Sequence, residues 1–187
     1  MQLPAACCEA TTAPAPSVTA FVCVNCAPGA AGGPGRRRPA GPLTSGWPVN
    51  AREVTVPCGG RCQPEHLPKA LEDGADVVCL VACEESDCHY LEGCLRARRR
   101  VEHVRRLMAE IGLEPRRLML LSLPGTARQD MAAGAAAAAA PSAPPADPAE
   151  RLEAIRGQVM ANLESLPPSP LRRGASAGRG EAAEGAR

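Results

Sequence analysis

Apolar and polar positions divide the chain into short strand-like runs and longer helical patterns. Residues 77–82 form a continuous apolar run of strand length, which is typical of a strand covered on both faces. Further strands are predicted at 18–24, 53–57 and 117–123. Apolar residues at spacings of three and four predict helices over about 65–74, 91–112 and 148–166. Because strands alternate with helices, we expect an α/β fold with a small open, mostly parallel sheet of about four strands and flanking helices.

Proline, glycine and alanine mark the limits of the part that can fold. The 187 residues include 20 prolines and 18 glycines, so the packed core is small. We predict a disordered tail at 1–17, one α/β domain at 18–123, an Ala/Pro-rich linker at 124–147, an amphipathic helix at 148–166 and a second disordered tail at 167–187.

Charge and aromatic content exclude some classes of function. The net charge is +1, and the chain has one Trp, one Tyr and one Phe. A nucleic-acid binder would need a basic surface and aromatic rings for base stacking, so we expect no nucleic-acid partner. No apolar run reaches the roughly 18 residues that span a bilayer, and the first residues do not form a secretory signal. We therefore predict a cytoplasmic protein without a membrane span.

Cysteines follow three of the predicted strands. Cys23 and Cys26 end the first, Cys58 and Cys62 follow the second, and Cys83 and Cys88 follow the third. Parallel strands end at one edge of a sheet, where open α/β folds bind their ligands, so we expect these thiols to converge there. Cys79 lies within a strand and is interpreted as a small buried hydrophobic residue.

Clustered thiols in a reducing compartment more often bind metal than form disulfides. The spacing alone is compatible with an iron–sulfur cluster or with zinc. The pair Cys23 and Cys26 also permits a thiol oxidoreductase, although the other four cysteines would then have no role.

Three motifs carry a resemblance to a known family. They are Cys-x-x-Cys at 23–26, Cys-Gly-Gly-Arg at 58–61, and Ala-Cys-x-x-x-Asp-Cys-His-Tyr at 82–90 followed by a glycine and an arginine-rich helix. Over about residues 21–122 this order resembles the delta subunit of methyl-viologen-reducing hydrogenase. The resemblance implies a [2Fe-2S] cluster and a non-catalytic subunit that relays electrons from a hydrogenase or formate dehydrogenase to a heterodisulfide-reductase-like flavoprotein.

The same resemblance assigns the candidate site residues. The cluster ligands are expected among Cys23, Cys26, Cys58, Cys83 and Cys88, with four ligating and one spare. Cys62 and Cys94 are possible alternative ligands. Beside the cluster we expect Arg61, Asp87, His89 and Tyr90, where hydrogen-bond donors can tune its potential. His89 could instead only cap the following helix. After Cys26 the chain has a Gly/Pro-rich loop where the family usually continues with a short helix.

The helix at 91–112 is unusually rich in arginine. One interpretation is a solvated helix face, and the other is a docking surface for an acidic partner. The candidate docking residues are Arg96, Arg98, Arg99, Arg100, Arg105 and Arg106.

Overall fold

The computed structural model describes residues 15–26, 37–38, 43–85, 88–125 and 148–171. Four parallel strands form the centre of the sheet: β1 (Ser17–Cys23), β3 (Asn50–Val56), β4 (Val77–Cys83) and β5 (Leu118–Leu123). A short antiparallel strand, β2 (Arg37–Arg38), pairs with β3 at one side, so the order is β2-β3-β1-β4-β5. The predicted α/β fold with a mostly parallel sheet is confirmed.

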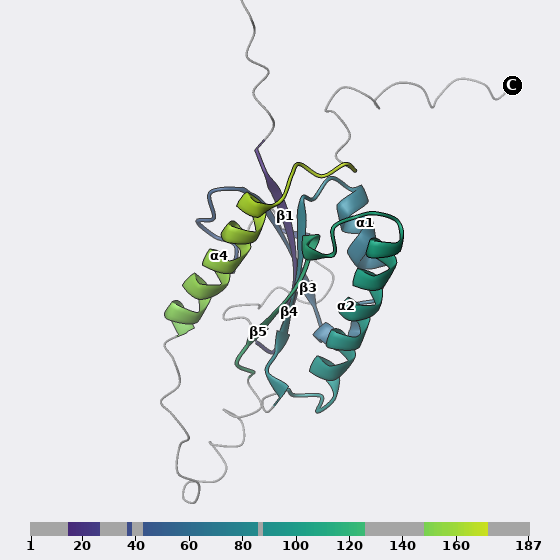
Figure 1. Ribbon diagram of the computed structural model, residues 1–187. Coiled ribbons are helices and arrows are strands. Elements are labelled where there is room, and N and C mark those ends of the chain that lie inside the picture. Colours follow the sequence, from purple (N-terminus) through teal and green to yellow (C-terminus); the bar gives the residue numbers. More distant parts are fainter. Residues whose placement is uncertain (1–14, 27–36, 39–42, 86–87, 126–147, 172–187) are drawn as a thin grey trace, which may run out of the picture.

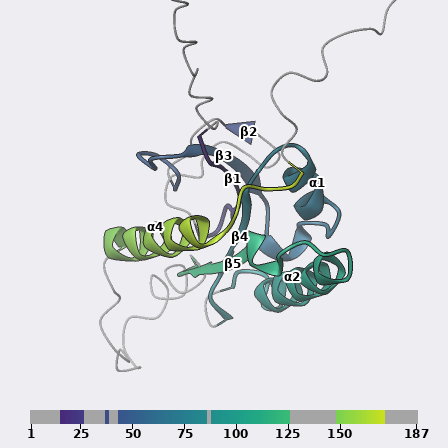
Figure 2. The same cartoon turned by 45° about the horizontal axis from the view of Figure 1, so that its top comes forward.

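Helices cover both faces of this sheet. α1 (His66–Glu72) and α2 (Gly93–Glu110) lie on one face, and α4 (Pro148–Ser165) lies on the other (Figure 1). The same three layers are visible when the molecule is turned (Figure 2). Because β4 has helices on both sides, all seven of its residues are buried, which explains its unbroken apolar sequence.

The core therefore has two halves. Toward α4, Val22 and Val81 of the sheet pack in one cluster with Ile155 and Val159 of the helix. Toward α1 and α2, Leu80 lies in a second cluster that contains Leu67, Val101 and Met108, among others. Apart from their cysteines both halves are mainly aliphatic, with Trp47 in the first and Phe21 in the second.

Two glycines end the helices on the α1/α2 face. Gly74 and Gly112 adopt φ values of +102° and +77°, in the left-handed region that favours glycine after a helix. Each lies just after the last turn and returns the chain toward the next strand. The helix predicted at 91–112 accordingly ends at Glu110.

The amino-terminal edge of the sheet is held by two buried charged residues. Asp76 accepts hydrogen bonds from the backbone N–H of Ser17 (2.9 Å) and of Ser169 (3.1 Å). Arg117, which is 1% exposed, donates to the carbonyl oxygens of Asp76 (3.2 Å) and Pro167 (2.8 Å). We refer to Asp76 and Arg117 as the amino-edge clamp. It ties the segment after α4 to the sheet, so residues 167–171, expected in the disordered tail, have an ordered path.

Within the described parts of the chain, no helix is both long enough and apolar enough to cross a membrane.

Candidate metal centre

The carboxyl-terminal edge of the sheet gathers sulfur from separate strands. β1 ends at Cys23 and β4 ends at Cys83, and these strands are direct parallel neighbours. Cys58 follows the end of β3, the neighbour of β1 on its other side. Since all three strands run in one direction, their terminal residues meet at one edge, the lower end of the sheet in Figure 1.

Three of the sulfurs form a compact group. Cys23 Sγ lies 3.7 Å from Cys83 Sγ, and the Sγ atoms of Cys23, Cys26 and Cys83 all lie within 4.8 Å of one another. Two thiolates bound at about 2.3 Å to one tetrahedral ion lie about 3.8 Å apart. The Cys23–Cys83 separation therefore suits two ligands of a single metal ion.

Cys58 and Cys88 form a second group against Gly93, the first residue of α2. A Cβ added at Gly93 would overlap Cys58 Sγ and would lie 3.0 Å from Cys88 Sγ. A Cβ added at Gly60 would likewise overlap the backbone of Gly93. The two glycines let the turn after β3 pack directly on the start of α2, and this packing brings both sulfurs together.

Hydrogen bonds between the thiols shift their pKa values in opposite directions. Hydrogen bonds with Cys26 and then with Cys83 lower the pKa of Cys23, whereas the bonds that Cys26 makes with Cys23 and Cys83 raise the pKa of Cys26. The Cys23 bond also raises the pKa of Cys83, to about 12. Burial raises the pKa of Cys58, and negative charge on Cys23 or Cys88 raises it further. Negative charge on one of these thiols therefore disfavours negative charge on its neighbours, and a bound cation would offset this repulsion.

The turns after the strands direct backbone donors at the sulfurs. The N–H groups of Asn25 and Gly59 lower the pKa of Cys23, and those of Gly60 and Arg61 lower the pKa of Cys58 against the effect of burial. Asn25 Nδ2 also lies 3.9 Å from Cys23 Sγ. Such donors stabilise thiolates rather than thiols.

The remaining cysteines lie differently. Cys62 is buried on the α1/α2 face in one cluster with Leu67, and burial raises its pKa to about 11. Cys58 and Cys62 lie at the two ends of the 3₁₀ turn Gly59–Arg61, and Cys62 packs in the cluster beneath α1 and α2 instead of joining the sulfur groups. Burial raises the pKa of Cys94, and the charge of the neighbouring Cys88 raises it further. Cys79 is fully buried within β4, as expected of a small hydrophobic residue.

The residues expected beside the cluster are mostly exposed. Arg61 and His89 are exposed, Tyr90 is 52% exposed, and Asp87 lies outside the described residues. The His89 ring packs edge-on against Tyr90, with centroids 5.0 Å apart. Glu92 occupies the N-cap position of α2, and its side chain makes no capping hydrogen bond.

The arginines of α2 divide into internal and external groups. Arg100 donates to the carbonyl oxygens of Gly60 (2.5 Å) and Cys62 (2.8 Å), and Arg105 donates to that of Leu118 (2.9 Å). These two guanidinium groups therefore connect α2 to the turn after β3 and to the start of β5.

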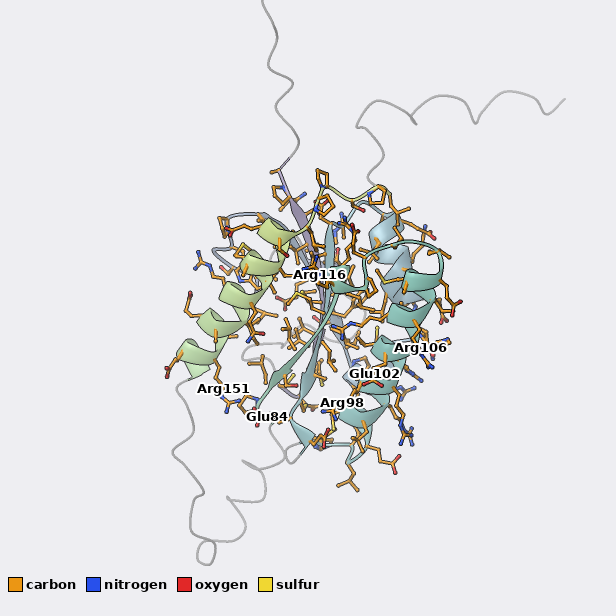
Figure 3. The ribbon with its side chains drawn as sticks, viewed as in Figure 1. Glu84, Arg98, Glu102, Arg106, Arg116 and Arg151 are labelled. Carbon is orange, nitrogen blue, oxygen red and sulfur yellow. The ribbon has the colours of Figure 1, made fainter. Side chains whose placement is uncertain are left out.

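The other four arginines face outward. Arg96 pairs with Glu92 (3.0 Å) and Arg98 with Glu85 (2.5 Å), while Arg99 and Arg106 are exposed. Figure 3 shows Arg98 and Arg106 along α2. The outward-facing basic surface therefore includes four of the six arginines that the sequence predicted for docking.

Sequence reasoning assigned no packing role to several residues that shape this centre. Gly60 and Gly93 set the approach of the second sulfur group, and Arg100 anchors the turn between them. Glu84 pairs with Arg151 of α4 and so joins that helix to the strand end beyond Cys83 (Figure 3). The adjacent glycines after Cys58 were the one available signal, because they permit close backbone approach.

Comparison with known proteins identifies the family. The model of a family described as methyl-viologen-reducing hydrogenase, delta subunit, matches residues 18–139. The chain belongs to this delta subunit family. All the cysteines of both sulfur groups lie within the matched region, and α4 lies outside it.

Related proteins carry consistent names. The iron-sulfur subunit of an F420-non-reducing hydrogenase from Archaeoglobus profundus is 41% identical over 87 residues, which are 46% of this chain and 64% of that protein. The vhu iron-sulfur subunit of the F420-non-reducing hydrogenase from Methanopyrus kandleri is 37% identical over 103 residues, or 54% of this chain and 72% of the relative.

A larger relative is also informative. One subunit of the ferredoxin:CoB-CoM heterodisulfide reductase from Methanosarcina mazei is 35% identical over 106 residues, which are 57% of this chain but 13% of that protein. The delta-type region is therefore a small part of that relative.

Proposed function

We propose that this member of the delta subunit family is an electron-transfer protein whose buried thiolates hold a [2Fe-2S] cluster. The observation that carries the proposal is the meeting of two sulfur groups, from three parallel strands, at one sheet edge. A two-iron cluster takes two protein thiolates on each iron, which matches two neighbouring pairs of cysteines. When bound, such a cluster accepts and releases one electron at a time.

The geometry favours one ligand set among the five candidates. Cys23 and Cys83, with sulfurs 3.7 Å apart, would hold one iron, and Cys58 and Cys88, which meet at Gly93, would hold the other. Cys26 would be the spare thiol. Its Sγ lies 3.6 Å from the carbonyl oxygen of Cys23, so it is placed as a hydrogen-bond donor at the edge of the group.

The residues of the chain would protect and tune this centre. All five candidate ligands are at most 7% exposed, so the fold excludes water from the sulfurs. The N–H groups of the turns after β1 and β3 favour the thiolate forms, as outer-shell donors do around other metal sites. His66 and His103 are exposed on α1 and α2, and we assign no catalytic acid or base.

The relatives support a place between two larger redox proteins. Since the named relatives belong to hydrogenases and to a heterodisulfide reductase, we propose that electrons arrive from a hydrogenase. A formate dehydrogenase is a second proposed donor, which rests on the family resemblance alone. The electrons would leave to a heterodisulfide-reductase-like flavoprotein. The exposed Arg99 and Arg106 would steer an acidic partner. We place the protein in the cytoplasm, where the thiols stay reduced.

One specific observation supports zinc as a second candidate. The compact group of Cys23, Cys26 and Cys83 supplies three of the four ligands that a structural zinc ion takes. In that case the domain would be a zinc-stabilised interaction module. A thiol oxidoreductase is disfavoured, because Cys23 and Cys26 are 1% and 7% exposed and a redox-active thiol must reach its substrate.

Metal analysis of the anaerobically purified protein separates these candidates. We expect a coloured protein with equimolar iron and acid-labile sulfide, about two of each per chain, and a paramagnetic signal after chemical reduction. Stoichiometric zinc in a colourless protein would overturn the cluster and support the interaction module.

A further inference from the structure

We propose that Tyr90, Leu91 and Leu95 form the contact surface through which the proposed electron-transfer protein meets its acceptor, a flavoprotein of the heterodisulfide reductase type. We call these three residues the apolar tip. The inference rests on the proposed function and adds the surface and the partner that binds there. The partner face that fits it is an apolar patch bordered by acidic side chains.

The apolar tip lies directly outside the second sulfur group. The N–H of Leu91 donates to the carbonyl oxygen of Cys88 (3.0 Å), and Cys94 Sγ lies 4.0 Å from the carbonyl oxygen of Leu91. Gly93, two residues further along, contacts the sulfurs of Cys58 and Cys88. Little more than one layer of backbone therefore separates the tip from two of the proposed ligands.

The tip is exposed to a degree that the fold does not require. Leu91 is 83% exposed, Tyr90 is 52% exposed and Leu95 is 37% exposed. Neighbouring exposed apolar side chains of this kind mark binding surfaces, and tyrosine is enriched at their centres. In contrast, the sheet faces bury nearly all of the aliphatic residues of the strands.

The backbone at Leu91 gives a separate indication. Its φ is +58°, and it is the one residue other than glycine with positive φ among the described parts of the chain. Glycine or asparagine would adopt this conformation at lower cost. Because the Leu91 side chain is exposed, burial within this chain does not offset the cost of this backbone conformation. Contact with another molecule explains why a leucine is found there. Strained residues of this type cluster at functional sites.

The charged side chains around the apolar tip indicate which charge the partner carries at the border of its own patch. Arg96 and Arg98 have their charges partly balanced by Glu92 and Glu85, whereas Arg99 is exposed and has no ion pair among the residues described. The border of the tip is thus basic on the α2 side, and an acidic border on the partner complements it. The apolar centre with a charged rim is the usual arrangement of a protein–protein interface.

Electron transfer gives a reason for this location. Tunnelling rates fall steeply with distance, so the partner must approach where the least protein covers the sulfurs. Among the residues that the structure describes, the other exposed large apolar side chains are Leu107 and Ile111, at the opposite end of α2. There they border a groove of about 490 Å³ between α1 and α2. They are therefore matched controls rather than candidates.

One of the related proteins indicates which partner binds the apolar tip. A region similar to this chain is part of a heterodisulfide reductase polypeptide in Methanosarcina mazei. A delta-type domain can therefore work within the same chain as a heterodisulfide reductase component. A hydrogenase bound at the tip is the competing outcome of the test below.

The test compares Leu91→Glu and Leu91→Gly with the control Ile111→Glu in the full-length protein. Iron content and the visible spectrum are measured first. Each variant is then titrated against the purified heterodisulfide reductase homologue and, separately, against the purified hydrogenase from the same organism, with binding affinity and electron-transfer rate as the readouts. We expect both Leu91 variants to bind the reductase at least about tenfold more weakly with unchanged iron, and Ile111→Glu to change binding less than about twofold.

Each outcome decides the proposal. Wild-type affinity in both Leu91 variants overturns the apolar tip, as does an equal loss in Ile111→Glu. A loss of binding to hydrogenase with retained binding to the reductase overturns the choice of partner. Wild-type protein without iron overturns the proposed function instead. Binding still reports on the tip in that case, because the affinity measurement does not depend on a cluster.

Discussion

The two ends of the sheet both contain buried polar or ionisable side chains, but these side chains have different partners. The amino edge has a charged pair, and the carboxyl edge has thiols. At the amino edge, Asp76 and Arg117 bond to the backbone of distant segments at 2.8 to 3.2 Å. Among the described residues, no buried side-chain nitrogen or oxygen is left without a partner. At the carboxyl edge, the buried thiols contact each other and backbone carbonyls at 3.6 to 4.0 Å.

The difference separates a structural cluster from a functional one. The amino-edge clamp satisfies strong donors and acceptors with one another, which stabilises the ends of the chain. Thiols are weak hydrogen-bond donors and acceptors, so such contacts do little for the fold. Their gathering is explained by metal binding, for which thiolate is a preferred ligand.

The largest expected effect is the loss of iron when a proposed ligand is removed. Cys83→Ser should lose nearly all bound iron, because the sulfur 3.7 Å from Cys23 Sγ is replaced by a hard oxygen ligand. Cys79→Ser is the matched control, since Cys79 is buried in the same strand away from the edge. Iron analysis and visible absorbance check this, and a Cys83→Ser protein with full iron content would contradict the ligand assignment.

The amino-edge clamp should affect stability but not metal. Arg117→Met leaves the carbonyl oxygens of Asp76 and Pro167 without their donor, and we expect a loss of about 1–3 kcal/mol in the free energy of unfolding. Arg99→Met, at an exposed position, should change it by less than about 0.5 kcal/mol. Denaturant titration measures both.

Iron content per folded molecule should stay at the wild-type level in Arg117→Met. If iron were lost in proportion to the lost stability, the two edges would not be independent.

A glycine substitution sharpens the contrast at the carboxyl edge. In Gly93→Ala the added methyl overlaps Cys58 Sγ, so we expect destabilisation of about 1–3 kcal/mol together with reduced iron. Gly157→Ala in α4 meets no atom within 4 Å and should stabilise the protein by roughly 0.5–1 kcal/mol. Opposite signs in thermal unfolding are therefore expected, and equal effects would argue against close packing at Gly93.

The spare thiol is expected to have a smaller effect. Cys26→Ser should retain iron, because Cys26 is assigned as a hydrogen-bond donor beside the ligands, and its loss should only alter the visible spectrum. If Cys58→Ser kept its iron and Cys26→Ser lost it, Cys26 would be the ligand and Cys58 the spare thiol.

The smallest effect concerns acid stability near the amino-edge clamp. The hydrogen bond from Arg117 holds the pKa of Glu114 below its usual value of 4.5. A carboxylate with a lowered pKa stabilises the fold above the unfolded-state pKa, and this stabilisation is lost as the pH falls through the folded-state pKa. Thermal unfolding of wild type should therefore drop below pH 4.5 slightly more than that of Glu114→Gln. Parallel curves would exclude this contribution.

Sequence patterns predicted the elements well where local signals are strong. The unbroken apolar run became β4, and the helical pattern with a terminal glycine became α2. The grouping of Cys58 with Cys62 was less successful, because spacing along the chain does not show which side of a 3₁₀ turn faces the sulfurs. Arg100 and Arg105 were placed on a docking surface, yet they bond to backbone carbonyls contributed by other elements.

The sequence by itself determined the alternation of strands and helices and the positions of cysteines at strand ends, because both follow from local periodicity and from parallel strand direction. Only the tertiary structure decided which sulfurs meet. That outcome depends on the close approach of Gly60 to Gly93, which lie far apart in the chain. Such contacts depend on packing in three dimensions, and a one-dimensional pattern does not encode them.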